Sequence, residues 1–281
     1  MSTWTDWESR LSSVSENPAG ELALLTESVL GLSSQRFRLL RLTGELPSCS
    51  AEQEGILSRL VDRRCQGEPL QYLIGSADFY GRRFAVAPGV LIPRFDTEIL
   101  VDTALPLLNE GDCILDLCAG SGCIGLTLGL EKSLSVTLVE KYDGALQILK
   151  KNKEALYPSA ILLQADVLQD AVDGPYDMIL SNPPYIPTAD LAVLSPEVKR
   201  EPVTALDGGD DGLLFYRAII QRFSPSLKEG GYFLFECGIG QACALEQLLC
   251  SAGFRDTFRV RDYGGVERVV GAKKPKEKPY V

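Results

Sequence analysis

The strongest constraint on the fold is an alternation of short apolar runs with longer helical segments, which continues from residue 99 to residue 251. A strand that is apolar along its whole length is buried on both faces, and helices between such strands cover a parallel sheet. The pattern therefore predicts an α/β fold with a Rossmann-like, mostly parallel sheet. Strands are expected at 113–118, 135–140, 160–163, 177–182 and 232–237, and helices at 99–108, 124–130, 142–155, 212–223 and 241–251.

Two further strands, at 256–261 and 266–272, close the pattern. The connection between them is short and contains Gly264 and Gly265, which permits a tight turn. Strands joined in this way run antiparallel, so an antiparallel hairpin is expected at one edge of the sheet.

The first part of the chain has a different character. Apolar residues recur there at helical spacing, with short polar breaks between the helices. Two short apolar runs then follow, 77–86 and 90–92, around Pro88 and Gly89, and they predict a hairpin. The expected organisation is a small helical, partner-binding domain at 1–75, a β-hairpin linker at 76–92 and the α/β domain at 93–281.

Composition limits the class of protein. Hydrophobic residues make up 45% of the 281 residues, so a large core can be buried. No apolar run approaches the roughly 18 residues of a membrane span, and the N-terminus lacks the regions of a signal peptide. A soluble, cytoplasmic protein without a membrane partner is expected. The net charge of −10 argues against direct nucleic-acid binding, which needs a basic surface.

Histidine is absent, which excludes serine and cysteine catalysis that depends on imidazole and the H-E-x-x-H zinc site. The eight cysteines form no C-x-x-C pair and are interpreted as buried, reduced thiols. No metal site is predicted, and any chemistry has to work without a histidine base.

A glycine-rich turn, DLCAGSGCIG at 116–125, follows the first strand of the α/β domain. Gly120, Gly122 and Gly125 match the G-x-G-x-x-G spacing, and Glu140 lies 20 residues after the first glycine. Glycines let the backbone approach a ligand closely, and a carboxylate at the tip of the next strand accepts hydrogen bonds from ribose hydroxyls. The spacing alone does not name the cofactor.

Asp116 separates the possible cofactors. A carboxylate inside the strand, four residues before the first glycine, would repel a pyrophosphate but suits a cationic amino-acid group. S-adenosylmethionine carries an ammonium and a sulfonium and no phosphate, so it is favoured over NAD. Asp166 follows the third strand, where it could meet the adenine amino group. In the alternative reading, Asp116 caps the following turn and Glu140 is a solvated strand end.

The fourth strand ends in LSNPPYIP, residues 180–187. Asn182 stands at its carboxyl end, where ligands bind in such sheets, and two prolines without N–H groups follow it. The Asn182 side-chain oxygen and the Pro183 carbonyl can accept the two N–H bonds of a planar NH2 group, and Tyr185 can supply an aromatic wall. The pattern predicts methyl transfer to an amide or amine nitrogen. A tight, strand-ending turn is the structural alternative.

These residues resemble a known family. N-P-P-Y after a fourth strand is shared by many amino-methyltransferases that act on DNA, RNA or protein. Further segments resemble the protein-(glutamine-N5) methyltransferases that modify peptide chain release factors. These segments are EPLQYLIGSADFYGRRF (68–84), VLIPRFDTEILV (90–101), EPVTALDGGDDGLLFYR (201–217) and DYGGVERVV (262–270).

The resemblance implies a class I S-adenosylmethionine-dependent methyltransferase domain with a helical N-terminal domain. Its substrate would be the glutamine of the Gly-Gly-Gln loop of release factors. The site residues would be Cys118, Ala119, Gly120, Ser121 and Gly122 in the cofactor turn, Glu140 at the ribose, Asp166 and Val167 at the adenine, and Asn182, Pro183, Pro184 and Tyr185 at the glutamine amide. Asp116 and Asn182 would also border the cofactor.

The chain departs from the family at three positions. It has Val167 where an aromatic residue is frequent, Phe95 where proline is common, and Cys118 where the turn usually opens with glycine. Three other functions stay open at this point. They are a nucleic-acid N-methyltransferase, a dinucleotide-dependent oxidoreductase and a non-catalytic module that keeps a cofactor pocket.

Overall fold

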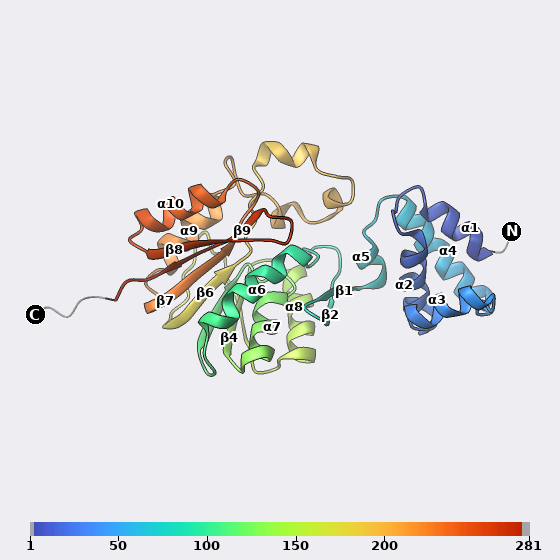
Figure 1. The fold of residues 1–281 in the computed structure, drawn as a ribbon, viewed down its shortest axis with the longest axis horizontal. Helices are drawn as coiled ribbons and strands as arrows, with labels where there is room; N and C mark the ends of the chain where they lie inside the picture. Colours follow the sequence, from blue (N-terminus) through green and yellow to red (C-terminus); the bar gives the residue numbers. More distant parts are fainter. Residues whose placement is uncertain (1–2, 277–281) are drawn as a thin grey trace, which may run out of the picture. The chain divides into compact units, whose positions relative to one another are not determined.

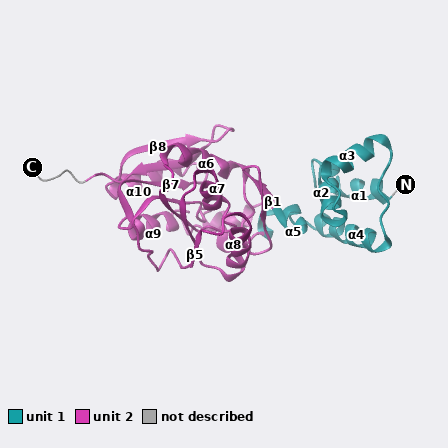
Figure 2. Ribbon diagram, turned by 90° about the horizontal axis from the view of Figure 1, so that it is seen from below, with its two compact units in different colours: residues 1–76, 195–200 teal, residues 77–194, 201–281 magenta. Residues whose placement is uncertain are grey.

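The computed structural model describes residues 3–276 and divides into two compact units. The first unit contains residues 1–76 and 195–200, and the second contains residues 77–194 and 201–281 (Figure 2). The first two residues of the expected helical domain and the last five of the expected α/β domain lie outside the described residues.

Helices build the first unit, as the spacing of its apolar residues predicts. Asn17 caps the second helix by accepting a hydrogen bond from Gly20, and Ser50 and Gln53 form a capping box at the start of the fourth. The core is built around Trp4, Trp7 and other apolar side chains that are almost fully buried. The helices are α1 (Thr3–Leu11), α2 (Pro18–Leu30), α3 (Ser34–Thr43), α4 (Ala51–Cys65) and α5 (Leu70–Ile74).

A two-stranded hairpin follows, formed by β1 (Ser76–Phe79) and β2 (Arg82–Ala85). Its turn lies at Tyr80 and Gly81, both with positive φ, which is the geometry of a tight hairpin turn. The expected turn at Pro88 and Gly89 is therefore wrong, and 90–92 is not a strand. Ile92 is buried, but its N–H bonds the Glu201 carboxylate at 3.1 Å instead of a neighbouring strand.

The second unit is built on a seven-stranded sheet in the order β5-β4-β3-β6-β7-β9-β8. The first five of these strands are parallel, while β9 runs antiparallel to both β7 and β8. The predicted mostly parallel sheet with an antiparallel hairpin at its edge is thus confirmed. The strands are β3 (Cys113–Leu117), β4 (Ser135–Glu140), β5 (Ile161–Gln164), β6 (Tyr176–Ser181), β7 (Leu227–Glu236), β8 (Arg255–Arg261) and β9 (Glu267–Lys273).

Helices cover both faces of this sheet (Figure 1). One core holds apolar residues from α6 (Glu98–Ala104), α7 (Cys123–Lys132) and α8 (Asp143–Leu156). The opposite core holds those from α9 (Leu214–Phe223) and α10 (Ala242–Ser251). Successive residues of a strand point to opposite faces, so Ile114 enters the first core and Leu115 the second. No helix within residues 3–276 combines the length and apolarity needed to cross a membrane.

The order of the strands indicates where in this sheet a ligand can bind. Because β3 pairs with β4 on one side and with β6 on the other, the chain order reverses at β3. In such sheets ligands bind beyond the carboxyl ends of the strands at this reversal. Leu117 of β3 is paired with Val139 of β4 and with Ser181 of β6, so the segments after these strands leave the sheet side by side.

The core on the α9 side contributes to the stability of the second unit. Phe235 is fully buried, with its ring centroid 5.4 Å from that of Phe233 and 5.6 Å from that of Tyr216. We expect Phe235→Ala to lower the free energy of unfolding by about 3–5 kcal/mol. Phe95→Ala, at a side chain that is 66% exposed, should change it by about 0.5 kcal/mol or less. Urea unfolding followed by circular dichroism measures both, and equal losses would contradict this assignment of the core.

Candidate active site

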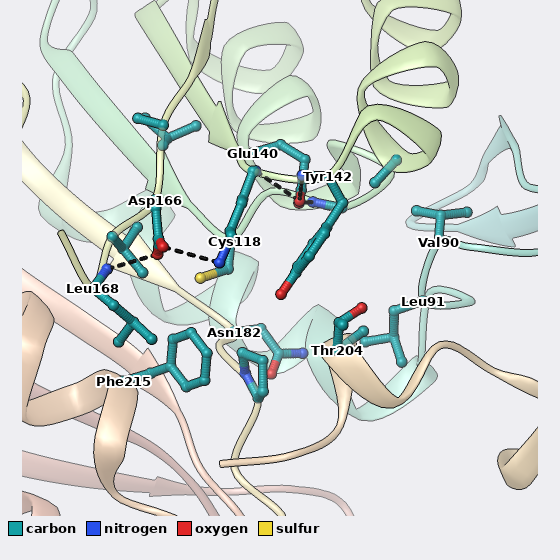
Figure 3. Close-up of a pocket in the computed structure, with 18 of the residues that line it drawn as sticks. Val90, Leu91, Cys118, Glu140, Tyr142, Asp166, Leu168, Asn182, Thr204 and Phe215 are labelled. Atoms are coloured by element: carbon teal, nitrogen blue, oxygen red, sulfur yellow. Dashed lines mark hydrogen bonds and ion pairs between the residues drawn. The ribbon is translucent and has the colours of Figure 1, made fainter. Parts of the chain in front are cut away.

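A pocket opens at the carboxyl ends of β3, β4 and β6, entirely within the second unit, and holds about 680 Å³ of empty space that is partly open to solvent. Figure 3 shows Glu140 and Asp166 on one side of it, Val90 and Leu91 on the other, and Asn182 between Phe215 and Thr204. The sequence-predicted residues in the lining are Cys118, Gly120, Glu140, Asp166, Val167, Asn182 and Pro184. Those outside the lining are Asp116, Ala119, Ser121, Gly122, Pro183 and Tyr185.

The glycine turn needs left-handed backbone at three positions. Gly120 and Gly122 have φ of +54° and +80°, where a side chain is disfavoured. A Cβ on Gly122 would also lie 2.4 Å from Leu149 Cδ1, so this position has no space for one. Cys118 has φ of +58°, which explains why glycine suits the opening of the turn and leaves Cys118 in a strained conformation.

Asp116 lies inside β3 and is fully buried. Its Oδ2 accepts a hydrogen bond from the Gly125 N–H at 2.9 Å, so the side chain caps the start of α7 as the alternative reading expected. Its Oδ1 has no partner within the described residues. Burial raises the pKa of Asp116 to about 7, although the Gly125 hydrogen bond partly opposes this shift. Direct contact between Asp116 and a cofactor stays a prediction.

Glu140 ends β4 and ties the turn to the next segment of the chain. Its Oε2 accepts a hydrogen bond from the Gly120 N–H at 2.9 Å. Its Oε1 accepts two more, from the Lys141 N–H at 2.8 Å and the Tyr142 N–H at 3.0 Å. A carboxylate has about four acceptor positions, so Glu140 keeps capacity for one donor from a ligand in the pocket.

Asp166 also lines the pocket and is paired with a cation. Lys141 Nζ is 2.9 Å from its Oδ2, and the Leu168 N–H donates to its Oδ1 at 3.0 Å. Burial works against the charged form, but these two contacts outweigh it and lower the pKa of Asp166 below its ordinary value. The carboxylate therefore stays charged, and the adjacent Val167 is buried in the apolar lining.

The segment after β6 is fixed by hydrogen bonds to residues outside the pocket lining. Asn182 Nδ2 donates to Thr97 Oγ1 at 3.2 Å, and Pro184 faces the pocket while Pro183 is buried. Gln241 Nε2 donates to the Tyr185 carbonyl at 2.8 Å and fixes the backbone after the prolines. The tyrosine ring itself does not reach the pocket lining.

Several residues of the site were not among the sequence-predicted ones. Leu91, Thr204 and Phe215 line the pocket, and Thr97 and Glu236 lie behind Asn182. A signal for Glu236 was present, because it ends the apolar strand YFLFE at the same edge of the sheet as Asn182. Leu91, Thr97, Thr204 and Phe215 all fall inside the segments that carry the family resemblance, but no local pattern marks them.

The lining favours a cationic ligand without phosphate. Glu140 and Asp166 are its acids, and Lys141 is the single lysine or arginine among the lining residues of the described chain. Lys141 is already paired with Asp166, so no free positive charge is left to balance a pyrophosphate. The lining residues therefore fit S-adenosylmethionine better than a dinucleotide.

The buried Asp116 makes a prediction about stability. A pKa that is higher in the folded than in the unfolded protein adds stability below about pH 4, and this is lost progressively as the pH rises through about 7. Asp116→Asn keeps an acceptor for Gly125 but cannot ionise. We expect the stability of this variant relative to wild type to rise by a few kcal/mol between pH 4 and 7, because each tenfold change in a protonation equilibrium is worth about 1.4 kcal/mol. Urea unfolding at several pH values tests this, and a constant difference would contradict a buried, neutral Asp116.

Comparison with known proteins agrees with this geometry. Residues 94–195 match the methyltransferase small domain family, and residues 3–75 match the PrmC N-terminal domain family. A methyltransferase from Pyrococcus furiosus of known structure shares the fold, with a TM-score of 0.57 at 16% identity over 78% of this chain and all of that one.

Curated relatives match over most of their length. A release factor glutamine methyltransferase from Geobacter sulfurreducens is 43% identical over 216 residues, which is 76% of each chain. The protein of the same name from Escherichia coli is 36% identical over 258 residues, which is 91% of this chain and 92% of that one. At this identity and coverage, the chain belongs to the family of release factor glutamine methyltransferases.

Proposed function

We propose that this protein transfers a methyl group from S-adenosylmethionine to the side-chain amide nitrogen, N5, of the glutamine in the Gly-Gly-Gln motif of peptide chain release factors. The observation that carries the proposal is the position of Asn182 in the lining of the acidic pocket, at the point where the order of the strands reverses. Membership of the family and the names of its relatives support the choice of substrate.

The chain's own residues would hold the acceptor. Asn182 Oδ1 and the Pro183 carbonyl oxygen would each accept one N–H of the planar glutamine amide, which directs its nitrogen into the pocket. Bound S-adenosylmethionine would supply an activated methyl group on a sulfonium. An amide nitrogen is a poor nucleophile, so alignment is the main contribution of the site. The nitrogen loses a proton readily once it has become cationic, and no histidine base is required.

The cofactor would lie between the glycine turn and the acids. Glu140 would accept a hydrogen bond from one ribose hydroxyl, and Asp166 one from the adenine amino group, with Val167 and Phe215 as apolar walls. Asp116 would support the cofactor site indirectly, because its hydrogen bond to Gly125 fixes the start of α7 and with it the glycine turn. The Oδ1 atom of Asp116 has no partner within the described residues, but Asp116 lies outside the pocket lining.

Replacement of Asn182 tests the site. In Asn182→Ala the acceptor amide loses one of its two fixed partners, so we expect turnover to fall by roughly 100-fold or more. Binding of S-adenosylmethionine should change by less than about threefold, since other residues form most of the cofactor lining. Mass spectrometry of a release factor after incubation measures the methyl gain, and calorimetry measures the binding.

Two outcomes would contradict the proposal. Wild-type turnover in Asn182→Ala would remove this residue from the mechanism. If RNA were methylated and the release factor glutamine were not, the protein would be assigned a different class of substrate. The release factor with its Gly-Gly-Gln glutamine replaced by alanine is the matched control, because it keeps the whole partner surface and lacks the acceptor nitrogen.

The helical unit is proposed to bind the release factor outside the Gly-Gly-Gln loop. Its α3 exposes two large apolar side chains, Leu39 at 54% and Leu42 at 86%, next to the exposed Arg38. Exposed apolar side chains bordered by charge are typical of protein interfaces. The helix thus offers a surface suited to a protein partner.

Leu42→Asp tests this surface. We expect the KM for an intact release factor to rise by roughly tenfold, the effect of losing about 1.4 kcal/mol of binding at an interface. The KM for a short Gly-Gly-Gln peptide should stay unchanged, because the peptide carries the acceptor loop and lacks the rest of the partner surface. Ile161→Asp, at a residue of the second unit that is 56% exposed and begins β5, is a control for the added charge. Equal effects on peptide and intact factor would contradict the proposed surface.

A further inference from the structure

The Asn182 amide has two orientations, related by a half turn, and only one presents its oxygen to a substrate amide. Asn182 lies in the pocket lining between Phe215 and Thr204 (Figure 3). The amide oxygen and nitrogen are almost equal in size, so shape alone does not select one orientation. If the site depends on the Asn182 oxygen, hydrogen-bonding neighbours have to select it, and residues next to Asn182 on the side away from the pocket can do so.

Glu236 stands directly beside Asn182 in the sheet. Ser181 of β6 is paired with Phe235 of β7, so the next residues along these parallel strands, Asn182 and Glu236, are neighbours. The Glu236 side chain is 2% exposed and does not line the pocket. It therefore cannot serve as a ligand for the substrate and has to act through its neighbours.

The Asn182 amide turns its NH2 group toward the residues around Glu236. Asn182 Nδ2 donates to Thr97 Oγ1 at 3.2 Å, and both side chains stabilise the charged form of the Glu236 carboxylate. The Oε2 atom of Glu236 has no hydrogen-bond partner within the described residues. An ionised carboxylate only accepts, so it turns the NH2 group of Asn182 toward itself and leaves Oδ1 facing the pocket.

We propose that Glu236 is a positioning residue that, together with Thr97, locks the Asn182 amide with its oxygen toward the substrate nitrogen. The proposal rests on the proposed function for its kinetic consequences, but the contact itself can be tested without turnover. It explains a buried carboxylate that the pocket does not use. It also explains why an acid stands there, since glutamine could donate as well as accept and would not select one orientation.

The lock depends on the charge of Glu236. Burial raises its pKa to about 7, and the charge of Asp96 adds to this, while the polar Thr97 side chain, Arg268 and the Asn182 side chain oppose it. Once protonated, the carboxyl group can donate to Asn182 Oδ1 and stabilise the unproductive orientation. Turnover should therefore rise with pH through about 7. The titratable groups that interact with Glu236 are Asp96, Arg268, Tyr185, Tyr216, Cys237 and Cys123.

The first experiment measures Glu236→Gln. We expect kcat for release factor methylation to fall by roughly 10- to 100-fold, as for a reacting group held about 1 Å out of place. The Kd of S-adenosylmethionine should stay within threefold of wild type, and the rise of turnover through pH 7 should disappear. Glu229→Gln, at the exposed start of the same strand, is the matched control and should change none of these values. Wild-type kcat with an unchanged pH profile in Glu236→Gln would overturn the proposal.

The second experiment covers the case in which Glu236→Gln does not fold. Thr97→Val keeps the shape of the side chain but removes the hydroxyl, so we expect a fall in kcat with little change in cofactor Kd. Thr97→Ser restores the hydroxyl and should recover most of the lost turnover. A loss that serine does not recover would show that shape, and not the hydrogen bond, matters at this position, and would overturn the role of Thr97.

The third experiment separates this inference from the proposed function. The chain has four asparagines, Asn17, Asn109, Asn152 and Asn182, so selective 15N-asparagine labelling gives four side-chain NH2 signals. The Asn182 pair should titrate with a midpoint near pH 7 in wild type and not in Glu236→Gln. An Asn182 signal that does not follow this titration would overturn the lock, whichever substrate is methylated. A wild-type protein that shows the titration but methylates no release factor would refute the proposed function alone.

Discussion

The register between β3 and β6 is the constraint on which the site depends. Leu117 is paired with Ser181, and the Ser181 hydroxyl donates to the Leu117 carbonyl at 2.6 Å, which closes the ends of the two strands together. Cys118 and Asn182 then leave the sheet as neighbours, so the glycine turn and the N-P-P-Y segment meet. A slip of one residue would turn Asn182 to the other face and move every apolar side chain of β6 with it. The same pairing rule, applied to β6 and β7, brings Glu236 beside Asn182.

Continuous apolar runs and turn residues identify most of the fold from the sequence. The strand expected at 135–140 is β4 without change, and the strand expected at 177–182 is β6 within one residue. These elements are predictable because a buried parallel strand has to be apolar along its length. The meeting of Glu140 and Asn182 at one pocket was also predictable, because both residues end strands of the same parallel sheet.

Contacts between distant segments could not be predicted in this way. Val90 and Ile92 are as apolar as a strand, but a buried loop bonded to Glu201 produces the same pattern. Tyr80 carries a positive φ that no propensity favours, and its N–H is held by Glu98 at 2.6 Å. Residues 195–200 belong to the helical unit through contacts such as Arg64 Nη1 to Glu197 Oε1 at 2.7 Å, between residues far apart in the chain.

Three of the acids at the carboxyl ends of the strands, Glu140, Asp116 and Glu236, have different surroundings, and the differences match the roles proposed for them. Glu140 is satisfied by three backbone N–H groups, so it stabilises the turn at little cost. Asp116 and Glu236 each keep a buried oxygen without a partner in the described chain, and burial raises the pKa of both to about 7. A buried carboxylate with an unpartnered oxygen is costly for folding. The acids therefore make sense as parts of the site, one holding the glycine turn and one selecting the orientation of Asn182.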